Sequence, residues 1–400
     1  MNILQLCTKS PYPPHDGGSM AMYSHTRCFV LLGHNVTVLT MCTHKHSMSE
    51  DDMAWLSSFT RLYTVAVNTS VNLLHLVFNF IFSHLPYNAV RFISPAFKRQ
   101  LTSILKSDTF DLVQLEGLYL VPYINVIRRH SEALIALRAH NVEHELWERI
   151  AQTETHTLKK YYFTSLASRI ASFETAALNL YDLLVPITPR DMEQFHSMGN
   201  QKPARVCPAG LDPDALAEQV VPPFQAALFF LGSLEWKPNQ DGLLWFVHHV
   251  FPQVRKRYPE LLLHIAGRNA PTWLPRLLEI PGVVFHGEVP DARDFIREHG
   301  IMVAPCFSGG GMRVKIVEGM YTGKPVVTTT IGAEGLEARH GEHILIADTA
   351  DGFADELISL LNNPDYFRKI GHNALNFIRL HFDNLKVAGE LAGFYQEHLS

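Results

Sequence analysis

The stretch IMVAPCFSGGGMRVKIVEGMYTGKPVVTT, residues 301–329, decides the fold class of this chain. An apolar run leads through three glycines into helical spacing over 312–322, and a second apolar run closes the stretch. Strand, glycine-rich loop, helix and strand in this order form the βαβ unit of a parallel sheet. The free N–H groups at such a helix start bind anions, and Arg313 and Lys315 add positive charge there. The stretch predicts a phosphate site, although a flexible loop with a solvated basic turn would show the same pattern.

Strand and helix patterns alternate along both halves of the chain, which predicts an α/β protein of two doubly wound, Rossmann-like domains facing each other across a cleft. The strands are expected at 3–7, 35–41, 62–67, 112–115, 133–137, 183–185, 227–232, 261–266, 283–286, 301–304 and 325–329. The helices are expected at 20–32, 143–180, 239–257, 312–322, 352–362 and 364–381. Proline and glycine then divide the chain into an acceptor-side domain at 1–205, a linker at 206–226, a donor domain at 227–381, and a helix at 382–400 that could cross back to the first domain.

Composition excludes several classes of protein. The 400 residues carry a formal net charge of −5, which argues against a nucleic-acid-binding face. The five cysteines are odd in number and contain no Cys-x-x-Cys pair, so neither a disulfide framework nor a thiolate zinc site is expected. The N-terminal residues lack a basic signal-peptide region, and no apolar run is long enough to span a bilayer. We therefore expect a cytoplasmic protein.

Residues 72–85, NLLHLVFNFIFSHL, are the most hydrophobic stretch and carry one narrow polar stripe. They are too short to span a membrane. They could rest on the inner face of a membrane, helped by Arg91, Lys98 and Arg99, or line a groove for a lipid acceptor. A buried helix of the N-terminal core is an equal alternative.

Two further segments carry polar residues at predicted strand ends. Gly17 and Gly18 precede the first helix, where they could admit a ligand close to the backbone or simply form a tight turn. His140 and Asn141 follow the strand at 133–137, at the edge where doubly wound sheets bind ligands. His140 is expected to handle protons or hydrogen bonds, with a structural histidine as the alternative.

No metal site is expected. His140 and His144 are four residues apart, but a third ligand is missing and the spacing is not His-Glu-x-x-His. Asp212 and Asp214 resemble the Asp-x-Asp of metal-dependent sugar transferases. They stand in a proline-rich linker, where a turn is the better interpretation.

Several segments in their order along the chain resemble a known family. They are His140-Asn-Val-Glu-His, Pro208-Ala-Gly-Leu-Asp, Gly232-Ser-Leu-Glu-Trp-Lys-Pro-Asn, Phe285-His-Gly-Glu-Val-Pro-Asp, and Ser308–Glu318 followed by Gly323-Lys-Pro-Val-Val. Together they resemble the GT-B fold glycosyltransferases of glycosyltransferase family four, which are retaining and use nucleotide sugars. The likeness extends over nearly the whole chain.

The resemblance implies a role for each matching residue. Glu318 would bind the donor ribose, Lys237 would hold the diphosphate, and His140 would contact the donor sugar, with Asn141 beside it. Backbone groups of Gly310, Gly311 and Met312 would face the donor, and Val289 would lie by the base. Gly17 and Gly18 would lie near the donor phosphates and the acceptor, and Gly232 and Ser233 by the diphosphate. Lys237, Arg313 and Lys315 would stabilise the leaving group, so neither a metal nor another cofactor is expected.

Two positions depart from the family pattern. The first glutamate of the family's pair is Gly310 here, and the usual arginine near Gly232 is Ser233. The resemblance implies a retaining, metal-independent hexosyltransferase that acts in cell-surface polysaccharide or glycoconjugate synthesis, with a glycan, a lipid-linked molecule or a small molecule as acceptor. The departures leave two alternatives, a nucleotide-sugar epimerase of the same fold and a catalytically weakened nucleotide-binding subunit.

Overall fold

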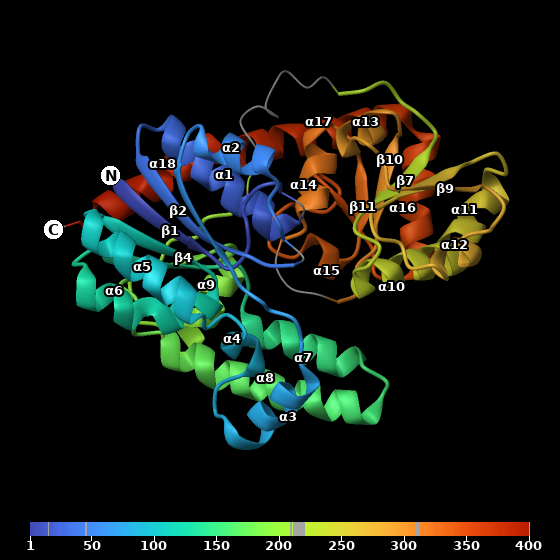
Figure 1. The fold of residues 1–400 in the computed structure, drawn as a ribbon. Helices are drawn as coiled ribbons and strands as arrows, with labels where there is room; N and C mark the ends of the chain where they lie inside the picture. Colours follow the sequence, from blue (N-terminus) through green and yellow to red (C-terminus); the bar gives the residue numbers. More distant parts are fainter. Residues whose placement is uncertain (15, 45, 209, 211–220, 309–311, 400) are drawn as a thin grey trace. The chain divides into compact units, whose positions relative to one another are not determined.

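The computed structural model describes residues 1–400 except 15, 45, 209, 211–220, 309–311 and 400. The chain forms two compact units. Unit 1 consists of Met1–Pro213 together with Asn384–Ser400, and unit 2 of Asp214–Asp383. Each unit contains a six-stranded parallel sheet with helices on both faces (Figure 1).

Unit 1 has the strand order β3-β2-β1-β4-β5-β6. The strands are β1 (Asn2–Cys7), β2 (Asn35–Cys42), β3 (Arg61–Ala66), β4 (Leu112–Glu116), β5 (Leu134–Ala139) and β6 (Leu183–Pro186). The chain builds outward from β1 to β3 and then returns to place β4 on the other side of β1. Doubly wound sheets bind ligands at the carboxyl ends of the strands where the order reverses, here between β1 and β4.

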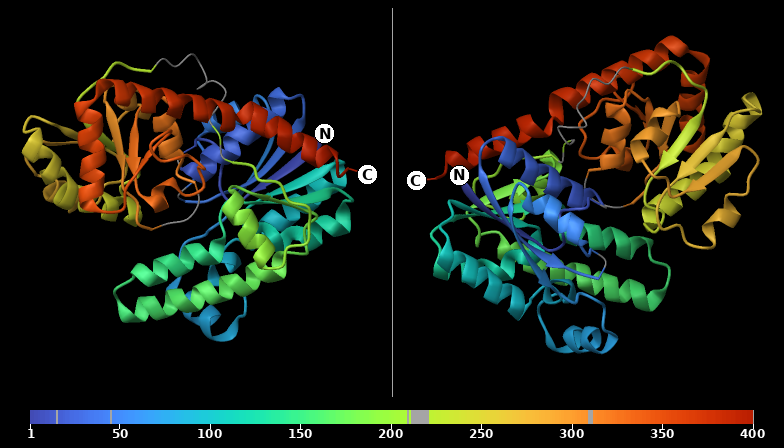
Figure 2. Two further views of the ribbon diagram at one scale, coloured as in Figure 1. Left: turned by 180° about the vertical axis from the view of Figure 1, so that it is seen from behind. Right: turned by 45° about the horizontal axis from the view of Figure 1, so that its top comes forward.

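Helices cover both faces of the first sheet. The helices of unit 1 are α1 (Gly17–Leu31), α2 (Glu50–Ser57), α3 (Leu73–Phe82), α4 (Tyr87–Val90), α5 (Pro95–Ser107), η1 (Leu118–Tyr123), α6 (Ile124–His130), α7 (Glu143–Thr153), α8 (Thr157–Ala177), α9 (Pro189–Ser197) and α18 (Asn384–Gln396). Buried residues of α5, α6 and α8 pack on one face, and those of α1 and α18 on the other. Figure 2 shows α18 lying beside the N-terminal strand, although it is the last element of the chain.

Unit 2 repeats the topology of unit 1, with the strand order β12-β11-β10-β7-β8-β9. Its strands are β7 (Leu228–Leu231), β8 (Leu263–Ala266), β9 (Val283–Gly287), β10 (Ile301–Ala304), β11 (Val326–Thr328) and β12 (Leu345–Ile346). Its helices are α10 (Lys237–Trp245), the π-helical segment η3 (Phe246–Val250), α11 (Phe251–Arg257), α12 (Leu274–Leu277), α13 (Ala292–Arg297), α14 (Val314–Tyr321), α15 (Thr330–Ala333), α16 (Ala350–Asn362) and α17 (Pro364–His381). The order reverses between β7 and β10, so the corresponding ligand edge lies there.

The predicted strands are all present, but three helical regions differ from expectation. Gly17 and Gly18 are the first residues of α1 and not loop residues, because Asp16 and Ser19 form a capping box ahead of them. The helix expected over 143–180 is two helices, since α7 and α8 pack along each other and the chain must turn between them. The helix expected over 239–257 contains the π-helical segment η3.

Helix α3 buries one residue of its polar stripe, Asn79, while Asn72 and His75 are exposed. Asn79 is buried and donates to the carbonyl of Leu85, while Arg169 of α8 donates to the carbonyls of Phe80 and Ser83 at 2.8 and 2.7 Å. Most of the apolar side chains point to solvent. The alternative of a buried core helix is therefore wrong, because Asn79 is the buried residue of α3 and the contacts with Arg169 are made by backbone carbonyls at the end of the helix.

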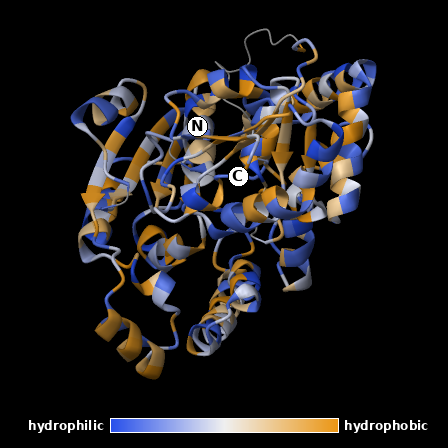
Figure 3. Cartoon of the chain, turned by 90° about the vertical axis from the view of Figure 1, so that its right-hand side faces the viewer, coloured by the Kyte–Doolittle hydropathy of each residue, from blue (hydrophilic) through white to orange (hydrophobic). Residues whose placement is uncertain are grey.

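The apolar surface of α3 is large. The exposed side chains are Leu73, Leu74, Val77, Phe78, Ile81 and Phe82, each at least 47% exposed. Figure 3 shows this helix almost uniformly orange at the bottom of the view. Along the described part of the chain, no helix combines the length and apolar character needed to cross a membrane.

Candidate functional site

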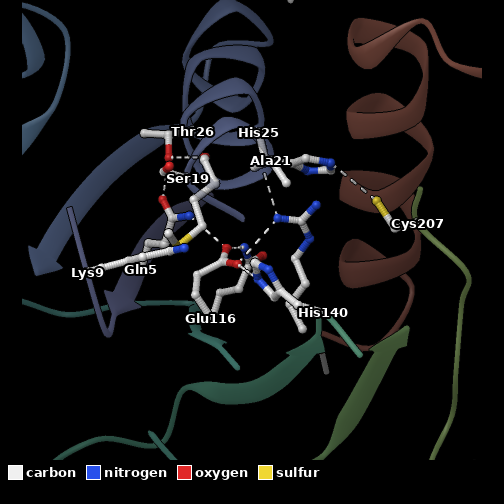
Figure 4. Close-up of polar contacts among 12 residues, drawn as sticks. Gln5, Lys9, Ser19, Ala21, His25, Thr26, Glu116, His140 and Cys207 are labelled. Atoms are coloured by element: carbon white, nitrogen blue, oxygen red, sulfur yellow. Dashed lines mark hydrogen bonds and ion pairs between the residues drawn. The ribbon is translucent and has the colours of Figure 1, made fainter. Parts of the chain in front are cut away.

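The ligand edge of unit 1 contains a buried carboxylate, Glu116, at the last position of β4 (Figure 4). Its Oε1 accepts from Gln5 Nε2 at 2.7 Å and from Gln114 Nε2 at 2.5 Å. Its Oε2 lies 2.7 Å from Nε2 of His140 and 3.3 Å from Nη1 of Arg138. Burial by itself would raise the pKa of Glu116, but the charge of Arg138 and the contact with His140 hold it well below its usual range.

The state of Glu116 sets the orientation of His140. An ionised carboxylate only accepts hydrogen bonds, so Nε2 of His140 carries the proton that is donated to Glu116. In the neutral ring, Nδ1 then has the lone pair and can accept a hydrogen bond from a hydroxyl group. The side chain of His140 is 18% exposed, so a ligand at this edge can reach it.

Arg138 is the buried counter-charge of this cluster. Its side chain is fully buried, and Nη1 donates to Glu116 and to the carbonyl of Ala21. Within the described residues, its Nε and Nη2 have no hydrogen-bond partner. A buried charge of this kind is tolerated because the carboxylate of Glu116 compensates it.

A second acidic cluster lies at the start of α7. Glu174 of α8 accepts from the backbone N–H groups of Glu143 and His144 at 3.0 and 3.3 Å, which caps the helix. It also contacts Nδ1 of His144 at 2.7 Å, which raises the pKa of His144. His140 and His144 are therefore each paired with a different carboxylate.

Glu143 has an environment suited to proton transfer. Burial raises the pKa of Glu143 to about 7, with a further contribution from the charge of Glu174, although the hydroxyl of Tyr119 donates to it at 2.9 Å. A carboxyl group with a pKa near neutrality can act as acid or base. Asn141 contacts Glu143 as well.

The start of α1 carries an ion pair beside the two glycines. Lys9 Nζ lies 2.5 and 2.6 Å from the carboxylate oxygens of Asp16. Burial opposes ionisation of Asp16, but the charge of Lys9 lowers its pKa to about 2. A Cβ atom at Gly18 would lie 3.0 Å from Lys9 Nζ, so glycine leaves room for this lysine.

The ligand edge of unit 2 is built around Gly232, directly after β7. Lys315 Nζ donates to Asn239 Oδ1 at 2.8 Å, and Asn239 Nδ2 donates to the carbonyl of Ser233 at 2.8 Å. A Cβ atom at Gly232 would lie 3.0 Å from Asn239 Nδ2 and 3.3 Å from Lys315 Nζ. The glycine therefore lets Lys315 and Asn239 approach the end of β7.

Lys315 is a half-buried cation that also lies 4.6 Å from the centre of the Phe230 ring. Burial lowers its pKa to about 8. It stands in the first turn of α14, which has no side-chain cap and no acidic residue in that turn. The N-terminal amides of α14 and Lys315 together favour an anion.

Glu318 lies one turn further along α14 and is half-buried. Burial raises its pKa to about 7, against the opposing charge of Arg293 on α13. Val289 lies in the loop between β9 and α13, and Met312 is half-buried just before α14. Gly310 and Gly311 lie outside the described residues.

Lys237 begins α10 and forms an ion pair with Asp241, one turn away. Its side chain is 73% exposed. Arg313 is held differently, because its Nε donates to Sγ of Cys306 at 3.4 Å.

Solved structures match nearly the whole chain, and a family model matches part of its second half. Residues 225–363 match the family described as Glycosyl transferases group 1. Sucrose-phosphate synthase from Thermosynechococcus elongatus aligns with a TM-score of 0.72 at 14% identity, covering 99% of both chains. Anabaena Alr3699/HepE in complex with UDP aligns with a TM-score of 0.70 at 14% identity, covering 99% of this chain and 100% of that one. The fold is that of the GT-B glycosyltransferases.

Two further proteins are similar over their full length. A mutant of TarM from S. aureus in complex with Fondaparinux, alpha-GlcNAc-glycerol and UDP has a TM-score of 0.71 at 10% identity, covering 99% of this chain and 100% of that one. An uncharacterized 44.6 kDa protein in the cps region of Klebsiella pneumoniae is 24% identical over 404 residues, which are 96% of this chain and 97% of that protein. The expected resemblance to GT-B glycosyltransferases is confirmed.

Within this GT-B fold, the predicted site residues fall into two groups, one in each unit. Gly17, Gly18, His140 and Asn141 belong to unit 1, and Gly232, Ser233, Lys237, Val289, Met312, Arg313, Lys315 and Glu318 to unit 2. Gly232, Ser233 and Lys315 come together through Asn239, whereas Lys237 is paired with Asp241.

Sequence reasoning missed Glu116, Lys9 and Asn239. A polar residue closing the apolar run 112–115 was a usable signal for Glu116, because strand ends face the ligand edge. Lys9 and Asn239 follow strand ends within a few residues, but no local pattern distinguishes them from solvated polar residues.

Proposed function

We propose that the protein is a retaining glycosyltransferase that transfers a sugar from a nucleoside diphosphate donor to a glycan or lipid-linked acceptor. The observation that carries the proposal is the half-buried Lys315 at the β7/β10 edge, in the uncapped first turn of α14. UDP is bound in the structures of Anabaena Alr3699/HepE and of TarM, which supports a nucleoside diphosphate as the donor group. The relative from the cps region supports a role in polysaccharide synthesis.

The donor diphosphate would lie against the start of α14. Lys315 and the helix N-terminus supply positive charge where negative charge grows on the leaving group, and electrostatic stabilisation of this kind often contributes more to catalysis than any other effect. Arg313 and Lys237 add charge, Lys237 after leaving Asp241. Glu318 accepts hydrogen bonds from the ribose hydroxyls, and Val289 contacts the base.

His140 would face the donor sugar. The carboxylate of Glu116 fixes its Nε2–H, which leaves Nδ1 to accept from a sugar hydroxyl. The part of the site that binds the donor sugar and the acceptor would also include Asn141, and Gly17 and Gly18 at the start of α1. In a retaining transfer without a protein nucleophile, the departing phosphate oxygen takes the proton of the acceptor hydroxyl, so the chain supplies positioning and positive charge.

Helix α3 would dock on an anionic membrane. Its outward face presents six large apolar side chains, and Phe80 contacts Tyr161 of α8 next to the exposed Lys159 and Lys160. Apolar side chains with neighbouring lysines suit the interface of an anionic bilayer. Arg91, by contrast, donates to the carbonyl of Thr69, so its guanidinium group already has a partner within the protein.

The environment of Glu143 supports one alternative function, that of a nucleotide-sugar epimerase. Its pKa of about 7 and its contact with Tyr119 provide the acid–base pair that an epimerase needs. Incubation of the donor without an acceptor separates the two functions. Isomerised nucleotide sugar would support the epimerase, and an unchanged sugar would support the transferase.

The proposal is tested with a panel of nucleoside diphosphates and their sugars. We expect one diphosphate to raise the melting temperature of the wild-type chain, since a ligand at 100 times its Kd stabilises the folded state by about 2.7 kcal/mol. Lys315→Gln should lose this shift and lower kcat/KM by about 100-fold or more. Lys256→Gln, an exposed lysine of α11, is the matched control and should behave as wild type. A wild-type chain that no nucleoside diphosphate stabilises would contradict the proposal.

A further inference from the structure

Three histidines from separate segments of unit 2 meet at the edge of its sheet. His264 lies on β8, His286 on β9, and His299 just after α13. One ring nitrogen of each lies within 4.8 Å of those of the other two. Nδ1 of His264 and Nε2 of His286 are 3.0 Å apart. The proposed transfer reaction uses none of these side chains.

His286 stands at a register shift of β9, next to His264 of β8. Ile265 pairs with Phe285, but the next residue of β8, Ala266, pairs with Gly287, so His286 is the extra residue of β9. Bulges turn a side chain out of the regular alternation of a strand and recur beside binding sites. The rings of His264 and His286 are stacked with their centres 5.3 Å apart.

His299 is fixed in the tautomer that a metal ligand requires. Its Nδ1 lies 2.6 Å from the carbonyl oxygen of Phe295, which can only accept, so Nδ1 carries the proton. The lone pair of the neutral ring is therefore on Nε2. Metal-bound histidines usually donate their other N–H to a carbonyl or carboxylate in this way.

The backbone of His299 is anchored as well. Lys324 is buried, and its Nζ donates to the carbonyls of His299 and Arg297, the latter at 3.0 Å. The rings of Phe295 and Phe229 lie 4.4 and 5.9 Å from that of His299 and close the inner side of the cluster. The outer side is open at His286, which is exposed.

We propose that His264, His286 and His299 form a binding site for one divalent transition-metal ion, Zn²⁺ in the first place. Zn²⁺ prefers four-coordinate sites with imidazole ligands, and a water molecule would fill the fourth position. With bonds of 2.0–2.1 Å, tetrahedral ligand nitrogens lie about 3.4 Å apart, so nitrogens that now lie within 4.8 Å of one another must close by at most about 1.4 Å. The bound ion would link His299, just after α13, to strands β8 and β9.

The test uses the full-length chain without an affinity tag, stripped with a chelator and titrated with Zn²⁺ against a chromophoric chelator. We expect wild type to take up one Zn²⁺ per chain and to gain thermal stability. His286→Gln removes an exposed ligand, so the fold should persist, and Zn²⁺ affinity should fall by at least about 100-fold, since loss of an outer-shell partner alone costs 10–100-fold. His264→Gln is the second variant and should give the same loss.

The matched control is His248→Gln, an exposed histidine in the π-helical segment of the same unit, which should bind Zn²⁺ as wild type does. Circular dichroism checks that each variant is folded. A wild-type chain that fails to compete with the chelator, or a His286→Gln chain that binds Zn²⁺ as tightly as wild type, would overturn the proposal. Neither outcome depends on donor binding, so the metal site and the transferase function succeed or fail separately.

Discussion

Two half-buried side chains of α14 have pKa values displaced toward neutrality, and this gives the unit 2 edge its chemical character. Burial lowers the pKa of Lys315 to about 8 and raises that of Glu318 to about 7. The pKa of each group is displaced because burial removes water from its charged form, and the neighbouring charges do not fully compensate this loss. A bound nucleoside diphosphate would stabilise the cation, and ribose hydroxyls would stabilise the carboxylate.

The pH dependence of the transfer follows from these two groups. Glu318 ionises as the pH rises through about 7, and Lys315 loses its proton above about 8. The form with both charges is most populated between these values, so kcat/KM should follow a bell-shaped profile with its maximum there. We expect Lys315→Arg to extend activity to higher pH, because arginine stays protonated, and Glu318→Gln to flatten the acidic limb. Initial rates at low donor concentration from pH 5 to pH 10 measure both effects, and variants that keep both wild-type limbs would contradict this assignment.

Glu116 should contribute strongly to stability. Glu116→Gln leaves the guanidinium of Arg138 buried without its counter-charge, and breaking a buried pair in this way costs about 3–5 kcal/mol. Asp241→Asn breaks the exposed pair with Lys237 and should cost at most about 1 kcal/mol. Urea unfolding at pH 7 compares the two variants.

The pH dependence of stability gives a second readout for Glu116. Its folded-state pKa is depressed, so its stabilisation is complete above its unfolded pKa, about 4.3, and is lost as the pH falls further. The difference between wild type and Glu116→Gln should therefore shrink in acid. An equal loss of stability in Glu116→Gln and Asp241→Asn would show that Arg138 does not need the carboxylate.

At the scale of elements, α3 is the feature that propensity does not explain. Arg169 of α8 donates to the carbonyl of Phe80, whereas most apolar side chains of α3 remain in water. Exposure of so many apolar side chains costs free energy unless a partner covers them. An amphipathic helix that lies on a surface has this distribution.

The membrane contact is tested by changing the outward face alone. Leu74 and Phe78 are 80% and 65% exposed, and burying each in a bilayer interface is worth about 1.5–3 kcal/mol. Leu74→Glu with Phe78→Glu should therefore lower binding to vesicles containing anionic lipid by about 100-fold or more, with little change in stability. Leu277→Glu, a half-exposed leucine of α12, is the control and should leave binding unchanged. Absence of vesicle binding by the wild-type chain would contradict a membrane role for α3.

The sequence predicted the strands well, apart from β12, because they are short apolar runs that glycine or polar residues interrupt, whereas helices such as α5 and α9 were not predicted. The opening of α1 was harder, since Gly17 and Gly18 suggest a loop and only the Asp16–Ser19 capping box shows that the helix has begun. The break between α7 and α8 contains neither glycine nor proline, so no local signal marks it.

The candidate site was predictable only in part. Lys315 and Glu318 stand in a recognisable pattern after the glycines, whereas their displaced pKa values depend on burial, which one sequence does not reveal. His264, His286 and His299 are well separated along the chain, and the packing of α13 beside β8 and β9 brings them together. Contacts of this type depend on tertiary structure, so single-sequence patterns miss them.

At the scale of the whole molecule, two sheets with the same strand order account for the architecture. In each unit the order reverses once, and the charged residues discussed above gather at the carboxyl ends of the strands on either side of that point. Side chains approach the backbone closely at these edges because residues 18 and 232 are glycines, which have no Cβ atom.

Unit 1 is discontinuous in sequence, and this has a consequence for synthesis on the ribosome. Leu391, Phe394 and Tyr395 of α18 complete a core whose other members lie between Ile3 and Cys207. All of unit 2 is translated in between, which at about 5–20 residues per second takes on the order of tens of seconds. Throughout that interval the apolar sheet face beside α1 lacks the cover that α18 supplies, so unit 1 completes its fold only after unit 2 has been translated, and this face would be a defined target for chaperones until α18 emerges.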